Sequence, residues 1–250
     1  MSPALLALPF GLAIGLLLGL VGGGGSILAV PVLVYVLGQP VKEATTESLL
    51  VVGTAALVGA IDHARVGRVQ MRTALAFGAA GALGALPGTA LNRVVPAQLL
   101  LVAFAGLLLA AAASLLRRRS DLLARSSDAS WARAAAAGVG TGVLTGFLGV
   151  GGGFLIVPAL VLLLGVPVKL AVGSSLLAIV LTSAAAFAAH LSSGGIDASI
   201  ALVFTGGAIG GTLAGRRLGT DISPERLGHV LACVLAAVGL FVLAELALAD

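Results

Sequence analysis

The chain has 250 residues, of which 59% are hydrophobic and only 10% are charged, and its mean hydropathy is +1.17. About a quarter of the residues of an average soluble domain are charged, so this composition excludes a water-soluble globular domain. The net charge of +4 is small and gives no reason to expect a nucleic-acid partner. The single cysteine excludes an internal disulfide framework and a cysteine-based metal cluster, and we expect no metal and no cofactor.

Ten apolar segments follow one another along the chain, five in each half. They cover about 4–21, 26–38, 44–61, 73–92 and 97–115, then 134–148, 153–165, 170–190, 198–215 and 227–246. The segments are continuous and rich in Ala and Leu, which favours membrane helices over the alternating strands of a β-barrel. No Lys or Arg precedes the first segment, so we expect it to be a retained membrane helix rather than a signal peptide. The pattern predicts an all-α polytopic membrane protein.

The second segment of each half is unusually short. Segments 26–38 and 153–165 have about 13 residues, which is too few to cross a bilayer unaided. Each begins at a run of glycines and ends at Gly-x-Pro. They are either re-entrant half-helices, which leaves eight full crossings, or helices that span a locally thin membrane.

The two halves are a tandem duplication. LVGGGGSILAVPVLVYVLGQPVKEATTESLL reappears 127 residues later as FLGVGGGFLIVPALVLLLGVPVKLAVGSSLL. Between 19–50 and 146–177, 18 of 32 positions are identical without a gap, more than shared composition predicts. We therefore divide the chain into a first transmembrane repeat at 1–116, a linker at 117–133 and a second repeat at 134–250.

Arginines indicate how the repeats are oriented. The linker carries five arginines, and the positive-inside rule places it in the cytoplasm. Loop 62–72 carries three arginines, whereas the equivalent loop 191–197 carries none and loop 216–226 carries three. Opposite orientations of the halves explain this difference, and five segments per half give that result if each glycine-rich pair forms a hairpin. The sequence therefore predicts inverted-topology repeats with broken or re-entrant hairpins and with both termini outside the cell.

The glycine runs predict an anion site. Four consecutive glycines cost a helix roughly 1 kcal/mol each relative to alanine, so we expect a break at each run. Helices that restart at Ser26 and Gly153 would point the positive ends of their dipoles at a cavity near the membrane midplane. The alternative is that the glycines only permit close helix packing.

The repeats resemble a known family. GLVGGGGSILAVPVL with ATTESLL, and GFLGVGGGFLIVPAL with AVGSSLL, are similar to the two signature repeats of the TauE/SafE family of sulfite exporter-like and sulfonate permease-like membrane proteins. The resemblance covers about residues 10–246. It implies secondary transport across the bacterial inner (plasma) membrane rather than enzyme activity. The substrates it implies are sulfur-containing or organic anions such as sulfite, sulfonates, thiosulfate or sulfoacetate.

The predicted substrate-binding residues come from the glycine breaks and the starts of the third segments. They are Gly22, Gly23, Gly24, Gly25, Ser26, Thr46, Ser48, Gly151, Gly152, Gly153, Gly173, Ser174 and Ser175. The hydroxyl groups among them are expected either to bind an oxyanion or to bond to their own helix. The family's Ala-x-Gly-Thr/Ser-Ser pattern is intact at 171–175, but the first half has Thr46 for the glycine and Glu47 for the first hydroxyl residue.

Glu47 is the most unusual side chain of the membrane segments. A carboxylate inside a transmembrane segment is a functional-site hypothesis by default, and Glu47 is a candidate for proton coupling. The alternative is that it favours the positive end of its helix dipole or lies at the water interface. Lys42 and Lys169 are expected to reach the membrane interface or to attract anions, and His63 and His190 to be caps or interfacial residues.

Three functions compete at this point. A transporter predicts inverted halves and a polar cavity at the midplane. An anion channel and, with less support, an intramembrane serine hydrolase are the alternatives; the hydrolase would need a serine within reach of a histidine. The expected partners are a small anion and the lipid bilayer, and the glycine stripes at 81–88 and 207–215 are compatible with internal packing or with a homodimer.

Overall fold

The protein is described by a computed structural model that covers residues 3–92, 95–117, 130–148, 153–190 and 196–249. Helices joined by short turns make up the described residues, among which no strand occurs. The helices of the first half are α1 (Pro3–Val21), η1 (Gly23–Gly25), α2 (Ser26–Pro31), η2 (Val32–Val36), α3 (Val41–Arg65), α4 (Met71–Asn92) and α5 (Ala97–Arg117). The second half forms α6 (Trp131–Leu148), α7 (Gly153–Leu162), α8 (Val168–His190), α9 (Ala198–Asp221) and α10 (Pro224–Ala249). The predicted all-helical class is confirmed.

Six helices are long and apolar enough to cross a membrane, namely α3, α4, α5, α8, α9 and α10. Helix α7 has only 10 residues, and α2 and η2 have 6 and 5. At 1.5 Å per residue these short elements extend about 15 Å, roughly half of the hydrocarbon core of a bilayer. The turns that follow them match, because Gly38 and Gly165 both have positive φ angles, 70° and 67°.

The boundary of α9 differs from the sequence prediction. Residues 216–226 were expected to form a loop, but α9 continues to Asp221 and carries Arg216 on its last turns. The physical reason is a partner on a neighbouring helix, since Arg216 forms an ion pair with Asp62 of α3. A charge that is paired in this way does not require the helix to end.

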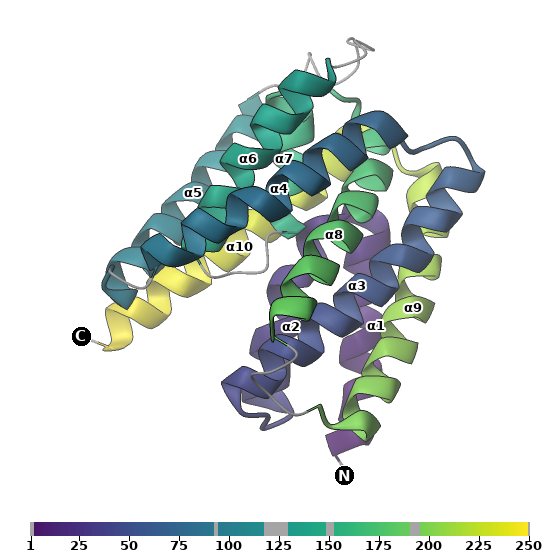
Figure 1. Ribbon diagram of the computed structural model, residues 1–250. Helices are drawn as coiled ribbons and strands as arrows, with labels where there is room; N and C mark the ends of the chain where they lie inside the picture. The colour runs from purple at the N-terminus through teal and green to yellow at the C-terminus, as the bar shows by residue number, and fades with distance from the viewer. Residues whose placement is uncertain (1–2, 93–94, 118–129, 149–152, 191–195, 250) are drawn as a thin grey trace.

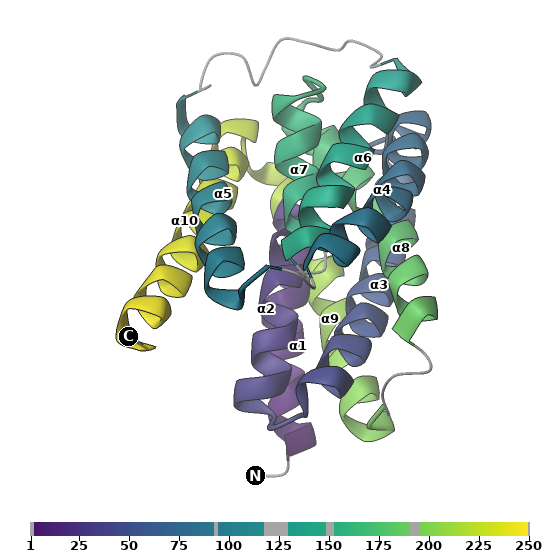
Figure 2. The same cartoon turned by 60° about the vertical axis from the view of Figure 1, so that its left-hand side comes forward.

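The long helices pack mainly in pairs (Figure 1). Helix α4 packs against α6 and α5 against α10, and these two pairs lie apart from each other in Figure 2, while α1 and α3 both pack against α9. In Figure 2 the end of α5 and the start of α6 lie at the top, whereas the start of α1 and the end of α10 lie toward the bottom. Helix α4 also packs against α8, and α3 packs against both α8 and α9.

The packing of one half is repeated by the other with the partners exchanged. The α1–α9 pair corresponds to α6–α4, and α3–α9 corresponds to α8–α4. Small residues permit both close pairs: a Cβ atom at Gly15 would overlap the carbonyl of Ala208, and one at the equivalent Gly142 would overlap the carbonyl of Gly81. The predicted role of the glycine stripes in close helix packing is confirmed within the chain.

Candidate functional site

The first glycine run interrupts the helix. Helix α1 ends at Val21, and Gly22 has φ 74° and ψ −123°, a conformation that side-chain-bearing residues rarely adopt. Gly23–Gly25 then form one 3₁₀ turn before α2 begins at Ser26. All four glycines are buried, so this non-helical backbone lies inside the protein.

The two repeats meet at this break, backbone against backbone. A Cβ atom at Gly23 would overlap the carbonyl of Gly153, one at Gly153 would overlap the hydroxyl of Ser26, and one at Gly22 would overlap the hydroxyl of Ser175. Gly24 is different, since its nearest neighbours are side-chain atoms at 3.7 Å or more. The predicted binding residues Gly151 and Gly152 lie outside the described residues.

Most of the predicted binding hydroxyl groups donate to a nearby backbone carbonyl. The Ser26 hydroxyl donates to Gly23 at 2.6 Å, and those of Thr46, Ser48 and Ser175 donate to carbonyls three or four residues earlier on their own helices at 2.8–3.1 Å. An oxyanion accepts hydrogen bonds, so these hydroxyl groups would have to turn away from the carbonyls in order to donate to it. Substrate binding by these groups therefore stays a prediction.

Ser174 and Gly173 bring a distant loop against α8. The Ser174 hydroxyl accepts a hydrogen bond of 2.9 Å from the backbone N–H of Gln70, the residue before α4. A Cβ atom at Gly173 would overlap the carbonyl of Arg68 and would lie close to the side chain of His63. These two predicted site residues thus position the 66–70 loop.

That loop is fixed by the way α3 ends. The N–H of Gly67 donates to Ala64 and the N–H of Arg68 donates to His63, at 3.0 and 2.9 Å. With Gly67 at φ 70°, this is the Schellman arrangement, in which glycine accepts the left-handed conformation. The helix ending thereby sets Arg68 in a fixed relation to His63.

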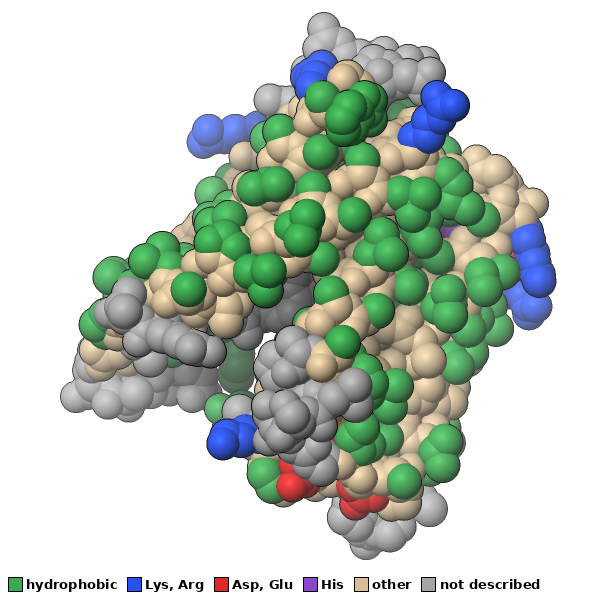
Figure 3. All heavy atoms as spheres, viewed as in Figure 1, with side chains coloured by type: hydrophobic (Ala, Val, Ile, Leu, Met, Phe, Trp, Pro, Cys, Tyr) green, Lys and Arg blue, Asp and Glu red, His purple; other side chains and the backbone are tan. Residues whose placement is uncertain are grey.

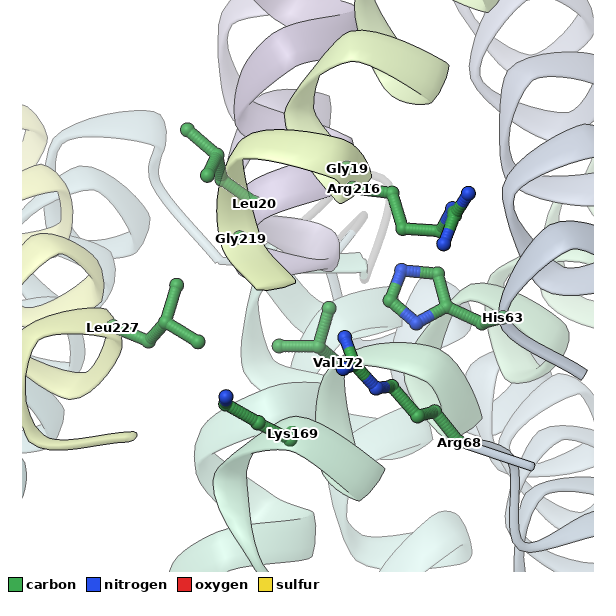
Figure 4. A pocket seen from close by; sticks show the side chains of 9 residues that line it. All are labelled: Gly19, Leu20, His63, Arg68, Lys169, Val172, Arg216, Gly219 and Leu227. Atoms are coloured by element: carbon green, nitrogen blue, oxygen red, sulfur yellow. The ribbon is translucent and has the colours of Figure 1, made fainter. Parts of the chain in front are cut away.

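His63 and Arg68 line a pocket together with residues of the second repeat. The lining, which we call the cationic pocket, consists of Gly19, Leu20, His63, Arg68, Lys169, Val172, Arg216, Gly219 and Leu227. Figure 4 shows the His63 ring between the side chains of Arg216 and Arg68, with Lys169 further along the wall. Gly19 and Leu20 lie in the last turn of α1, just before the glycine break, so the pocket lies next to this break.

The pocket carries an excess of positive charge. Arg216 is paired with Asp62, and these side chains are 15% and 20% exposed. Lys169 donates from Nζ to the Thr220 carbonyl at 3.2 Å. In the part of the chain that the structure describes, no carboxylate pairs with Arg68 or Lys169, so with His63 counted as neutral the pocket holds two uncompensated positive charges.

His63 makes no well-formed hydrogen bond to a described residue through its ring. Its side chain is 3% exposed, and neither ring nitrogen makes a hydrogen bond to a described residue, although the carbonyl of Gly19 lies nearby. The expectation of a cap or an interfacial residue is wrong for His63. The side chain of His190, its repeat equivalent, lies outside what the structure describes. A buried ring with free nitrogens lining a cavity is a group that can serve a ligand.

Sequence reasoning missed most of this pocket. Arg68 and Arg216 were used only to infer the topology, and Lys169 was expected either at the membrane interface or as a group that attracts anions. Lys169 is half-buried in the pocket wall, whereas its equivalent Lys42 is exposed. The one available signal was the repeat of both His and Lys at matching positions.

Glu47 lies at the opposite end of α3 and is fully buried. Its Oε1 accepts a hydrogen bond of 2.7 Å from the backbone N–H of Asp197, the residue before α9. Its Oε2 has no hydrogen-bond partner among the described residues. The alternative of a position at the water interface does not agree with its exposure of 0%.

Comparison with known proteins agrees with this architecture. The family model described as "Sulfite exporter TauE/SafE" matches residues 7–242. The chain belongs to the TauE/SafE family. A relative from Xylella fastidiosa (strain 9a5c), named "Probable membrane transporter protein", is 35% identical over 240 residues, which is 92% of this chain and 91% of the relative. "Probable membrane transporter protein YdhB" of Bacillus subtilis (strain 168) is 28% identical over 217 residues, 85% of this chain and 88% of that protein.

A more distant relative and the structural search complete the comparison. "Probable membrane transporter protein MJ0441" of Methanocaldococcus jannaschii is 27% identical over 259 residues, 96% of each chain. No solved structure matches the chain. As a TauE/SafE family member with six apolar helices of spanning length, the protein is a multi-pass membrane transporter. The hydrolase alternative has no support, because no described serine hydroxyl is bonded to His63.

Proposed function

We propose that this TauE/SafE protein is a secondary transporter of small oxyanions, sulfur-containing or organic, such as sulfite, thiosulfate, sulfonates or sulfoacetate. The observation that carries the proposal is the cationic pocket, to which both repeats contribute positive side chains beside the first glycine break. Arg68 and Lys169 are half-buried in the pocket wall and have no carboxylate partner among the described residues. An anion supplies that partner.

The orientation that we propose is that of inverted repeats in the inner membrane, with the 117–133 linker in the cytoplasm and both termini outside. Three arginines at the α3–α4 turn, Arg65, Arg68 and Arg72, support a cytoplasmic position for that end. Most of the Lys and Arg side chains visible in Figure 3 lie along its upper and right-hand edges, and the acidic ones lie at its lower end. The cationic pocket then opens toward the cytoplasm.

Transport requires the pocket to change shape. Its volume of about 10 Å³ is room for about one water molecule, which is less than an anion with three or four oxygens needs. We infer that the helices around the pocket separate when the anion binds, and that the anion then crosses the membrane along the glycine breaks. Rocking of one repeat against the other around a central site is how transporters with inverted repeats work.

Radiolabelled anion uptake into proteoliposomes tests the proposal. Arg68→Gln and Lys169→Gln remove the two uncompensated charges, and Arg65→Gln and Lys42→Gln are matched controls at exposed positions. A hydrogen bond to a charged group contributes about 1.5–3 kcal/mol, so each pocket variant should lower kcat/KM roughly tenfold or more, with the controls near wild type.

Three results would contradict the proposal. One is a wild-type protein that moves none of the sulfur-containing or organic anions. Another is pocket variants that transport as well as the controls, which would remove the cationic pocket from the path. A flux that does not saturate with anion concentration would favour the channel instead.

A further inference from the structure

The two repeats make the same long-range hydrogen bond twice. The N–H of Gln70 donates to the Ser174 hydroxyl at 2.9 Å, and the N–H of Asp197 donates to Oε1 of Glu47 at 2.7 Å. The positions correspond at the repeat offset of 127 residues, since 47 matches 174 and 70 matches 197. In each case the residue before a long helix of one half is anchored to the third segment of the other half. We call these two interactions the anchoring bonds.

In both anchoring bonds a backbone N–H is the donor, but the acceptor differs. One acceptor is a hydroxyl group and the other is a carboxyl group, which has one oxygen more than the hydrogen bond uses. A neutral hydroxyl suffices at Ser174, so one oxygen acceptor is enough to hold the backbone N–H. Glu47 supplies a carboxyl group whose second oxygen, Oε2, has no described partner although the side chain is fully buried. Burying a carboxylate with one oxygen unpaired is expensive, so a second role is needed to account for it.

The charged groups that act on Glu47 are acidic. They are Glu43, one turn earlier on α3, and Asp197 at the start of α9. Lys42 of the same helix is exposed. Of the cations on the packed helices, Lys169 of α8 and Arg216 of α9 lie in the cationic pocket, and Arg217 of α9 is exposed at that same end of the helix. That pocket is 16 residues along α3 from Glu47, about 24 Å away at 1.5 Å per residue.

Helices α3 and α9 are tied together at both ends. At one end Glu47 of α3 accepts from Asp197 before α9, and at the other end Asp62 of α3 pairs with Arg216 of α9. Arg216 and His63, the neighbour of Asp62, line the cationic pocket. If a change at Glu47 lets α3 shift against α9, the shift therefore moves Arg216 and His63, which line the pocket proposed to bind the anion.

We propose that Glu47 is the proton-binding site that couples anion movement to the proton gradient. This proposal rests on the proposed transport function. A proton from water binds Oε2 and yields the neutral acid, while Oε1 keeps the N–H of Asp197; release of the same proton to water restores the carboxylate. The equivalent Ser174 binds no proton, so only one of the two anchoring bonds responds to pH.

Uptake driven by a pH gradient tests the coupling. Wild-type proteoliposomes with the membrane potential clamped at zero should accumulate the transported anion, up to about tenfold per coupled proton for a one-unit gradient. Glu47→Gln and Glu47→Ser should lose this accumulation but keep anion exchange at equilibrium, since Ser174 shows that a hydroxyl makes the anchoring bond. Glu43→Gln removes a neighbouring charge but keeps the proton-binding carboxyl group, so it should still accumulate the anion. Accumulation in both Glu47 variants, or anion exchange without accumulation in the wild type, would overturn the proposal.

Infrared titration of the protein in lipid separates this proposal from the proposed function. A pH-dependent C=O band of a protonated carboxylic acid is expected in the wild type and in Glu43→Gln and is expected to be missing in both Glu47 variants. If the wild type moves no anion, the proposed function fails, and the band alone then decides whether Glu47 binds a proton. A band that survives in the Glu47 variants contradicts the proposal whatever the flux.

Discussion

Helix α3 has a polar site at each end. The two sites have equivalent hydrogen bonds, but one is cationic and the other is acidic. At its start, Glu47 is surrounded by acidic groups and holds the residue before α9. At its end, His63 lies among Arg68, Lys169 and Arg216, and Ser174 holds the residue before α4. The repeat equivalents show where the difference comes from: Arg216 matches Thr89, Arg68 matches Gly195 and Asp62 matches Ala189.

The two ends of α3 show how a duplicated membrane protein becomes asymmetric. The two halves keep the same backbone arrangement: the helix pairs, the glycine contacts and the anchoring bonds of one half recur in the other with exchanged partners. A few polar substitutions then make one end cationic and the other acidic. A transporter needs this difference if an anion and a proton are to be handled at separate places.

The largest effect is expected from the ion pair that only the cationic end possesses. Asp62→Asn or Arg216→Gln leaves one charge largely buried without its partner and should lower the free energy of unfolding by about 3 kcal/mol. The double variant should lose less than the sum of the single losses, since no orphaned charge remains. Denaturant unfolding in detergent measures the cycle, and additive losses would show that the pair is not coupled.

A smaller effect is expected at the glycines, where the two halves should behave alike. A Cβ atom at Gly211 would overlap the carbonyl of Leu12, and one at the equivalent Gly84 would overlap the carbonyl of Val139. Alanine at either position should cost about 1–3 kcal/mol, because backbones must separate. Gly210→Ala is the matched control on α9, since its Cβ would make an ordinary contact with Leu12. Unequal melting temperatures for the Gly84 and Gly211 variants would show that the two close helix pairs are not equivalent.

The smallest effect is expected at the helix cap before α9. The Asp197 carboxylate accepts from Ser199 and Ile200, and the hydrogen bond from the Ser199 hydroxyl is the main cause that lowers the pKa of Asp197. The cap therefore contributes its stability above the unfolded-state pKa of about 3.9, and this contribution is lost as the pH falls below that value.

Melting temperatures across pH test this cap. Asp197→Ala should melt slightly below wild type at pH 7, with the difference shrinking toward pH 3, whereas Asp197→Asn should retain most of the cap. Gln70→Ala, at the repeat equivalent, should show no such pH dependence, because its anchoring bond uses the backbone N–H. A pH-independent difference for Asp197→Ala would contradict the assignment.

Much of the fold was predictable because its signals are local. Apolar segments, glycine runs and the 127-residue repeat placed the ends of most of the helices within a few residues of where they lie, and the small-residue stripes predicted the close helix pairs. The prediction of a loop at 216–226 was wrong because clustered arginines do not by themselves end a helix. Whether Arg216 stays helical depends on Asp62, and no local pattern shows that contact.

The candidate site was only partly predictable for the same reason. Glu47 was detectable because a carboxylate in an apolar segment is unusual in any fold. The bonds of Glu47 and Ser174 join residues 150 and 104 positions apart, so their partners follow only from how the helices cross. His63 gave no local sign that its ring is buried beside Arg68.

The sequence by itself determined the membrane class, the internal duplication and the approximate ends of most of the helices, because hydrophobicity and glycine act within a few residues of themselves. Tertiary structure alone decided which helix ends meet. It brought positive side chains of both repeats into one pocket and left Glu47 buried at the other end, because close backbone crossings at small residues fix where each helix end arrives.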